Sequence, residues 1–345
     1  MSAGLMFLLF ILLMVIGVPI ALSLGVAGMA YVWSNGLALS MVAQKMTTSL
    51  ESFIYIALPL FILAGDIMTT GSLTRKLVNI AKALVGSFKG GLAYVNIVVS
   101  MLFGGIQGMA AADTVAIGSL MIPAMKEEGY DAGFSTAVTV ASSCIGAVIP
   151  PSFLFIVFGS MTGVSISAIF MAGLMPGILL GLLQMIYVFY LAHSKKHSGT
   201  IPAGEKITWK QRALFLIQGL PAMGLPLIIL GGICFGLVTT TESAVLAVLY
   251  ATVYCFVTKD ITIKDFCKLL YNDVQTIGSC MLILSTCSLF GYILTSERIP
   301  EGIVNVLLGI SDNFYVIVFI IILFLLFIGT FMDATPATMI MAPIL

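Results

Sequence analysis

Charged residues are scarce in this sequence. Only 9% of its 345 residues are Asp, Glu, Lys or Arg, whereas a typical soluble domain has roughly 25%. Hydrophobic residues make up 60%. A soluble fold of this size could not hide so much apolar surface, because a large share of any globular protein faces water. The composition therefore excludes an ordinary soluble domain and indicates a chain that lies in a lipid bilayer.

The sequence also lacks the short motifs of common enzymes. It contains no H-E-x-x-H, no P-loop and no G-x-S-x-G elbow, so neither ATP-driven chemistry nor hydrolysis is expected. Its six cysteines are scattered without metal-ligand spacing and are interpreted as small buried hydrophobes. The net charge is zero, which implies no nucleic-acid partner. No cofactor is expected.

What the chain has instead is a series of long apolar runs. Many approach the roughly 20 residues that a membrane-spanning helix needs, and helices satisfy every backbone group inside lipid. We therefore predict an all-α polytopic membrane protein. Gly17 and Pro19 interrupt the first run, which predicts a kinked or broken helix there. The apolar runs are 3–33, 53–68, 91–125, 132–162, 165–192, 213–239, 242–257, 274–295 and 314–332.

Two amphipathic segments and a hydrophilic loop separate these runs. Residues 72–89 place Leu73, Leu77, Ile80, Ala81, Leu84 and Phe88 on one helical face, which is typical of a helix in the membrane interface. This segment is basic, whereas the second one, 296–313, is net acidic. Lys and Arg outnumber acids in residues 193–212, so the positive-inside rule predicts a cytoplasmic loop.

A spacing recurs in the two parts of the chain. Asp113 lies ten residues before Pro123, and Asp333 lies ten residues before Pro343. Each aspartate follows a glycine-containing break and, further back, one of the two amphipathic segments. Similar units with opposite flanking charge favour an inverted repeat, as in many secondary transporters. The alternative is a chance match in apolar sequence.

The pair Pro150–Pro151 follows Gly146 and predicts an unwound segment over 141–151. Ser142 and Ser143 add hydroxyl oxygens, and such a break survives in lipid only if protein buries it or it lines a cavity. A simple proline kink is the alternative. The repeat places a counterpart of this pair beyond Leu345, so we expect a C-terminally truncated chain.

Four carboxylates lie in or beside apolar runs, where an acid usually needs a partner, a cavity or an ion. Asp113 and Asp333 sit next to the glycine breaks, so cation or substrate binding and helix capping are both open for them. For Asp66 and Glu242 we expect a structural role. Glu242 follows three threonines and is placed to begin a helix.

Six stretches, in this order, resemble the large membrane subunit (M, DctM-like) of tripartite ATP-independent periplasmic (TRAP) transporters. They are LPLFILAGDIM (58–68), GGIQGMAAADTVAIGSLMIPAMKEEGYD (104–131), ASSCIGAVIPPSFLFIVFG (141–159), FMAGLMPGILLG (170–181), GLVTTTESAVLAVLYA (236–251) and FMDATPATMIMAPIL (331–345).

The resemblance implies sodium-coupled uptake of an organic acid, such as a C4-dicarboxylate, sialic acid or a related carboxylate, across the bacterial inner membrane. It implies a periplasmic substrate-binding protein (P) and a small membrane subunit (Q) as partners. It also implies an elevator mechanism with two re-entrant helical hairpins, one over about 95–125 and one from about 329. The halves would be 1–192 and an incomplete 213–345.

Residue by residue, the resemblance implies two sodium sites and a substrate site. The family commonly has a serine-rich hairpin tip where this chain has Ile106, Gln107 and Met109. We therefore expect backbone carbonyls, more than side chains, to bind the ion at this tip. The first sodium site would comprise Gly105, Gln107, Gly108, Ser142, Ser143, Gly146 and Pro150. The second, partial sodium site would comprise Gly329, Thr330 and Asp333, and the substrate candidates are Met109, Asp113 and Thr114.

Two other functions remain as alternatives. One is a stand-alone Na⁺/carboxylate symporter of related elevator fold, which would need no partner subunit. The other is a membrane enzyme or scaffold without transport activity. Such an enzyme would need a catalytic pair of side chains that faces water, and the sequence offers no such pair.

Overall fold

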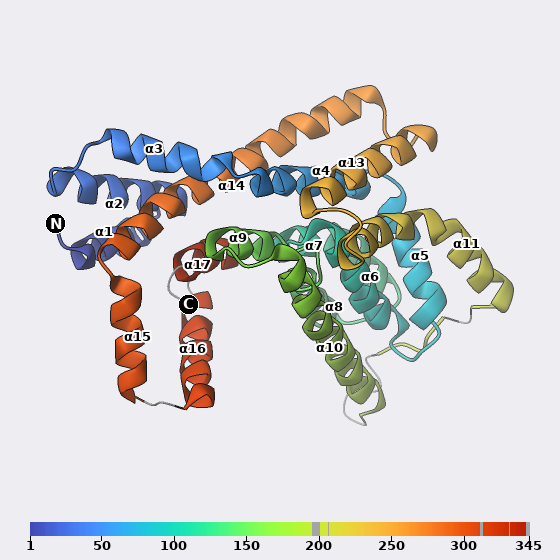
Figure 1. Cartoon of the computed structure of the whole chain (residues 1–345). Coiled ribbons are helices and arrows are strands. Elements are labelled where there is room, and N and C mark those ends of the chain that lie inside the picture. The colour runs from blue at the N-terminus through green and yellow to red at the C-terminus, as the bar shows by residue number, and fades with distance from the viewer. Residues whose placement is uncertain (195–200, 206, 311–312, 331, 343–345) are drawn as a thin grey trace. The chain divides into compact units, whose positions relative to one another are not determined.

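The computed structural model describes residues 1–194, 201–205, 207–310, 313–330 and 332–342, with the backbone alone at 107, 306–308 and 310. Within these ranges every regular element is a helix, which confirms the predicted all-α class (Figure 1). The chain divides into two compact units. Unit 1 comprises Met1–Tyr55, Val157–Gly163 and Val274–Leu345, and unit 2 comprises Ile56–Ile156 and Val164–Asp273.

Several helices are long and apolar enough to cross a bilayer, as expected for a multi-pass membrane protein. Shorter apolar helices accompany them. The expected division of the chain into two halves, 1–192 and 213–345, stays a prediction. The long apolar stretches are Phe53–Thr70, Ile166–His193, Trp209–Cys234, Thr240–Val257 and Ile263–Ser296.

Unit 1 begins with a helical hairpin. α1 (Ala3–Val15) and α2 (Ile20–Ser34) pack against each other, and Gly17 lies between them with φ +91°. The Met1 ammonium donates to Asn35 Oδ1 over 3.3 Å, so the far ends of the two helices meet. The predicted break at Gly17 and Pro19 is therefore confirmed, and it takes the form of a reversal of the chain.

The rest of unit 1 is helical too. Phe290 of α14 is fully buried against Phe7 and Phe10 of α1, with ring centroids 5.2 and 5.6 Å apart. The remaining elements of this unit are α3 (Ser40–Thr48), η1 (Ser49–Glu51), η2 (Phe53–Ile56), the second part of α14 (Ile263–Ser296), α15 (Ile299–Ile310), α16 (Phe314–Gly329) and α17 (Ala334–Met341).

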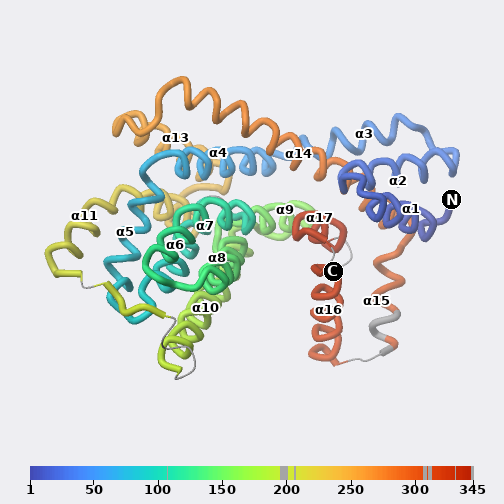
Figure 2. Tube along the Cα trace, turned by 180° about the vertical axis from the view of Figure 1, so that it is seen from behind, coloured from blue at the N-terminus to red at the C-terminus, as the bar shows by residue number. Residues whose placement is uncertain are grey.

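Unit 2 holds the helices on either side of the predicted first hairpin (Figure 2). α6 packs against α5, α7, α8 and α10, and α13 packs against α4. α9 (Phe153–Thr162) begins in this unit. The elements are α4 (Ala57–Thr70), α5 (Leu73–Val85), α6 (Gly91–Gln107), α7 (Ala110–Glu127), α8 (Ala132–Gly146), α10 (Ile166–His193), α11 (Trp209–Pro226), η3 (Leu227–Gly231), α12 (Gly232–Cys234), α13 (Thr240–Val257) and the start of α14.

The predicted basic amphipathic segment forms a helix, and part of its apolar face is buried within the protein. Leu73, Leu77, Ile80 and Ala81 are buried, and α5 packs against α11 and α6. Leu84, near the end of α5, and Phe88, beyond it, are exposed. Its position at a membrane interface stays a prediction.

Three predicted boundaries shift. α8 continues through Gly146, so the unwound residues are 147–152 instead of 141–151, and Ser142 and Ser143 are helical. α14 begins at Ile263, within residues 258–273, the hydrophilic interval between the apolar runs 242–257 and 274–295. α11 begins at Trp209, within the predicted loop 193–212, of which 195–200 and 206 lie outside the described residues.

Candidate functional site

The turn between α6 and α7 touches the break between α8 and α9. Gly108 has φ +64°, a left-handed conformation that favours glycine, and its carbonyl accepts a hydrogen bond from the Phe153 N–H over 3.2 Å. A Cβ at Gly108 would lie 2.2 Å from the Pro151 carbonyl oxygen. Only glycine therefore fits between the turn and the Pro150–Pro151 pair, whose peptide bond is cis.

A second close approach joins α6 to α8. A Cβ at Gly104 would lie 2.5 Å from the Gly146 Cα, and one at Gly105 would lie 3.5 Å from the Pro150 carbonyl oxygen. The structure thus brings together, within unit 2, the residues predicted for the first sodium site. Ion binding there stays a prediction. The set is Gly105, Gly108, Ser142, Ser143, Gly146 and Pro150, whereas the side chain of Gln107 lies outside the described residues.

A buried polar network lines this region. The Asn96 amide donates to Thr139 Oγ1 over 2.7 Å, and the Ser100 hydroxyl donates to Ser142 Oγ over 3.1 Å. The Ser143 hydroxyl donates to the Thr139 carbonyl over 2.8 Å. Asn96 and Ser100 were not among the residues predicted from the sequence. The two residues are four apart within an apolar run, so they lie on one helical face. This spacing is the sequence pattern that could have identified them.

Asp113 is the unusual member of the region. Its side chain is 1% exposed, and neither carboxylate oxygen has a hydrogen-bond partner among the described residues. The hydroxyls of Ser100 and Ser143 lie close enough to interact with it, but they donate their hydrogens to other acceptors. A buried carboxylate without donors is costly, so this position favours a bound cation.

The donor set around Asp113 suits a hard monovalent cation. The Asp113 carboxylate lies near the Ser100 and Ser143 hydroxyls, and its Cβ is 3.6 Å from the place of a Cβ added at Gly146, the last residue of α8 before the 147–152 break. No group of three His, Cys, Asp or Glu side chains that could hold a metal ion occurs in the described ranges. The residues therefore fit Na⁺ better than a transition metal.

The predicted substrate candidates cluster at the start of α7. Met109 is extended and half-buried directly before the helix, and Asp113 is its fourth residue. The Thr114 hydroxyl donates to the Ala110 carbonyl over 2.9 Å, so it is engaged within the helix. The positive end of the α7 dipole lies here and favours negative charge.

The predicted second sodium site has a different character. Asp333 is exposed, precedes α17 and accepts a hydrogen bond from the Thr335 N–H over 3.4 Å, so it caps that helix. The Thr330 hydroxyl donates to the Leu326 carbonyl over 3.0 Å. Gly329, Thr330 and Asp333 are all exposed. Their role in sodium binding stays a prediction.

The other two carboxylates have structural partners. Glu242 accepts a hydrogen bond from the Thr239 N–H over 2.7 Å, and its own N–H donates to Thr239 Oγ1, which is a capping box. This confirms the expected structural role of Glu242. Asp66 hydrogen-bonds to Asp273, a buried carboxyl that was not predicted from the sequence because it lies in the hydrophilic interval 258–273.

Comparison with known proteins agrees with the family resemblance. Residues 7–345 match the family described as "Tripartite ATP-independent periplasmic transporter, DctM component". The protein YgiK of Salmonella typhimurium is 39% identical over 97% of this chain and 77% of its own length.

Two further relatives carry functional names. The isethionate TRAP transporter permease protein DctMQ of Oleidesulfovibrio alaskensis is 38% identical over 97% of this chain and 53% of its own length. The sialic acid TRAP transporter permease protein SiaT of Haemophilus influenzae is 34% identical over 98% of this chain and 54% of its own length. The chain thus spans about half the length of these two proteins.

Proposed function

This chain belongs to the DctM component family of tripartite ATP-independent periplasmic transporters, and we propose that it is the permease subunit of a sodium-coupled organic-acid uptake system. The observation that carries the proposal is the buried, unpartnered carboxylate of Asp113 beside two helix breaks. A transporter needs a site whose charge changes when a coupling ion binds, and Asp113 offers one. The relatives with functional names are transporter permeases and not enzymes.

In this proposal Na⁺ is cargo, bound by oxygen atoms near Asp113. The cation offsets the carboxylate charge and makes the region attractive to an anionic substrate. The start of α7, with Met109 and Thr114, presents the positive end of a helix dipole to that substrate. Ser142, Ser143 and the 147–152 break supply neutral oxygens.

The proposed substrate class is an organic acid. The names of two relatives refer to isethionate and to sialic acid, and both molecules carry one anionic group. C4-dicarboxylates belong to the same proposed class. No arginine lies in residues 91–127. We therefore propose that a bound cation, backbone N–H groups and hydroxyls neutralise the substrate charge, in place of an ion pair with arginine.

The proposed architecture includes an inverted repeat, two re-entrant hairpins and an elevator movement in the bacterial inner membrane. The contact of the α6–α7 turn with the Pro150–Pro151 break supports a hairpin whose tip lies at depth in the membrane. α10 exposes large apolar side chains, including Leu179, Leu183 and Ile186, to lipid or to a small membrane subunit. A periplasmic binding protein is the second proposed partner.

Reconstitution tests the proposal. The full chain, with its candidate small subunit and binding protein, would be placed in proteoliposomes, and uptake of labelled sialic acid, isethionate and succinate would be followed. We expect uptake of at least one acid only with an inward Na⁺ gradient and the binding protein. Uptake that needs Na⁺ but no partner would favour the stand-alone symporter. Uptake that ignores Na⁺ would refute the coupling.

A further inference from the structure

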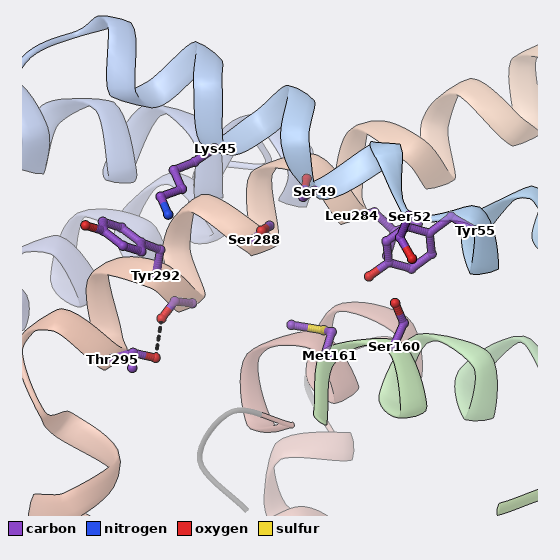
Figure 3. A pocket seen from close by; sticks show the side chains of 11 residues that line it. Lys45, Ser49, Ser52, Tyr55, Ser160, Met161, Leu284, Ser288, Tyr292 and Thr295 are labelled. Carbon is purple, nitrogen blue, oxygen red and sulfur yellow. Dashed lines mark hydrogen bonds between the residues drawn. The ribbon is translucent and has the colours of Figure 1, made fainter. Parts of the chain in front are cut away.

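Unit 1 contains a cavity of about 380 Å³ that shares no residue with the Asp113 region. Its walls come from the α3–η2 segment, the end of α9 and the second part of α14 (Figure 3). One lysine, Lys45, and seven hydroxyl-bearing side chains line it. No carboxylate is among the described residues that form its wall. The lining therefore carries one positive charge and several hydroxyl groups beside its apolar surface.

The charge of Lys45 has no acidic partner among the described residues. Its Nζ lies 4.0 Å from the centroid of the Tyr292 ring, and the side chain is half-buried. Across the described ranges the one ion pair is Lys82–Glu205. Glu297, the first residue after α14, accepts a hydrogen bond from Tyr31 instead. A partly buried ammonium held only by a ring face attracts an anion.

Several hydroxyl groups line the cavity around this charge. The hydroxyls of Ser52, Ser288 and Tyr292 line the cavity and make no hydrogen bond to any described residue. The Tyr55 and Ser160 side chains hydrogen-bond to each other, and Figure 3 shows the two facing one another. Free hydroxyls recognise hydroxyl, carbonyl and carboxylate oxygens of a ligand. The lining thus combines one positive charge with several neutral donors.

We propose that this cavity binds a small hydroxylated organic anion whose single acidic group contacts Lys45. Its volume lies within the range of small-molecule sites. One cation matches one acidic group, and the hydroxyls match the rest of an oxygen-rich molecule. The choice of acids as probes rests on the proposed function, but the site itself requires neither sodium nor Asp113.

Chemical footprinting locates such a ligand without altering the protein. The purified full chain would be acetylated with acetic anhydride, and modification of each lysine would be measured by mass spectrometry with sialic acid, isethionate, succinate, inorganic phosphate or glycerol present. Lys76 is the control, because it is also half-buried over a tyrosine ring, that of Tyr254, to whose hydroxyl it donates a hydrogen bond, and it does not line the cavity.

We expect sialic acid, the oxygen-rich monoanion of the series, to slow acetylation of Lys45 roughly tenfold or more and to leave Lys76 unchanged. The K45Q variant should bind this acid roughly tenfold more weakly in calorimetry, whereas K76Q should bind as the wild type does. Protection by phosphate alone, protection of both lysines, or no protection by any acid would overturn the proposal.

The D113N variant separates this inference from the proposed function. Protection of Lys45 that persists in D113N supports an independent site, and protection lost in D113N contradicts it. A failure of Na⁺-driven uptake with Lys45 still protected would remove the proposed transport mechanism alone. Normal uptake with unprotected Lys45 would remove the cavity proposal alone.

Discussion

Asp113 and Asp333 each lie ten residues before a proline and shortly after a glycine-containing break, yet the structure surrounds them differently. Asp113 is the fourth residue of α7, buried and without a hydrogen-bond partner among the described residues. Asp333 precedes α17, is exposed and caps that helix. A shared spacing along the chain therefore does not establish a shared chemical role.

The difference arises from what packs against each break. Gly104 and Gly146 let α6 and α8 approach backbone to backbone, and Asp113 lies against Gly146. At Gly329 an added Cβ would meet nothing within 4 Å in the described structure. Close helix packing excludes water from the first aspartate. The second is exposed, and its carboxylate accepts the hydrogen bond that caps α17.

The largest expected effect is on transport. Asp113→Asn removes the negative charge from a buried site and should lower Na⁺-driven uptake in proteoliposomes roughly a hundredfold. Asp333→Asn should change uptake less than about threefold, because asparagine caps a helix as well as aspartate does. Equal losses in the two variants, at equal protein levels, would show that the two aspartates act alike.

The next effect concerns the packing that buries Asp113. Gly104→Ala places a Cβ 2.5 Å from the Gly146 Cα, where neither backbone can yield without separating α6 from α8. We expect a destabilisation of about 2 kcal/mol or more, visible as a lower thermal midpoint in detergent. Gly329→Ala is the matched control and should leave the midpoint unchanged. Indistinguishable midpoints would contradict the described helix contact.

A smaller effect tests the cap. Asp333→Ala removes the acceptor for the Thr335 N–H and should destabilise the start of α17 by about 1 kcal/mol. Hydrogen exchange of the amides in 334–337 should accelerate in Asp333→Ala and stay near the wild-type rate in Asp333→Asn. Faster exchange in both variants would mean that the charge of Asp333, and not its capping geometry, orders this segment.

The smallest effect is a pH dependence at a third aspartate, Asp260, in the loop between α13 and α14. Burial raises its pKa, but hydrogen bonds from the Ser72 and Thr258 hydroxyls outweigh this and bring the pKa below its ordinary value. Since the folded pKa lies below the unfolded one, Asp260 stabilises the fold above the unfolded pKa. This contribution is lost as the pH falls through the folded pKa.

Ser72→Ala should therefore lower stability slightly at pH 7, by less than about 1 kcal/mol, and should weaken the loss of stability between roughly pH 5 and pH 3. Thermal midpoints measured across this range check the expectation. Ser279→Ala is the matched control, because the Ser279 hydroxyl donates only to the Gln275 carbonyl within its own helix. An identical pH profile for the wild type and Ser72→Ala would contradict the expectation.

Features set by local chemistry were predictable from the sequence. Gly17 and Pro19 break a helix wherever they occur together, and Thr239 with Glu242 forms a cap within four residues. The meeting of Gly108 with the Pro150–Pro151 break was also expected, although only from the family resemblance.

Features set by tertiary packing were not predictable. Nothing near Asp273 in the sequence reveals its burial, since α14 begins well before its apolar run. The helix through Ser142 and Ser143 continues because α6 and α7 pack along it. The cavity around Lys45 is formed by segments that lie far apart in the sequence, so no local sequence pattern predicts it.

Sodium-dependent thermal stabilisation of the purified chain tests the central claim most directly. A cation that binds the folded state at about a hundred times its Kd adds about 2.7 kcal/mol of stability. We predict that NaCl raises the thermal midpoint of the wild type above that in choline chloride of equal ionic strength, and that Asp113→Asn abolishes this difference. An equal Na⁺-specific shift in both proteins would contradict the account.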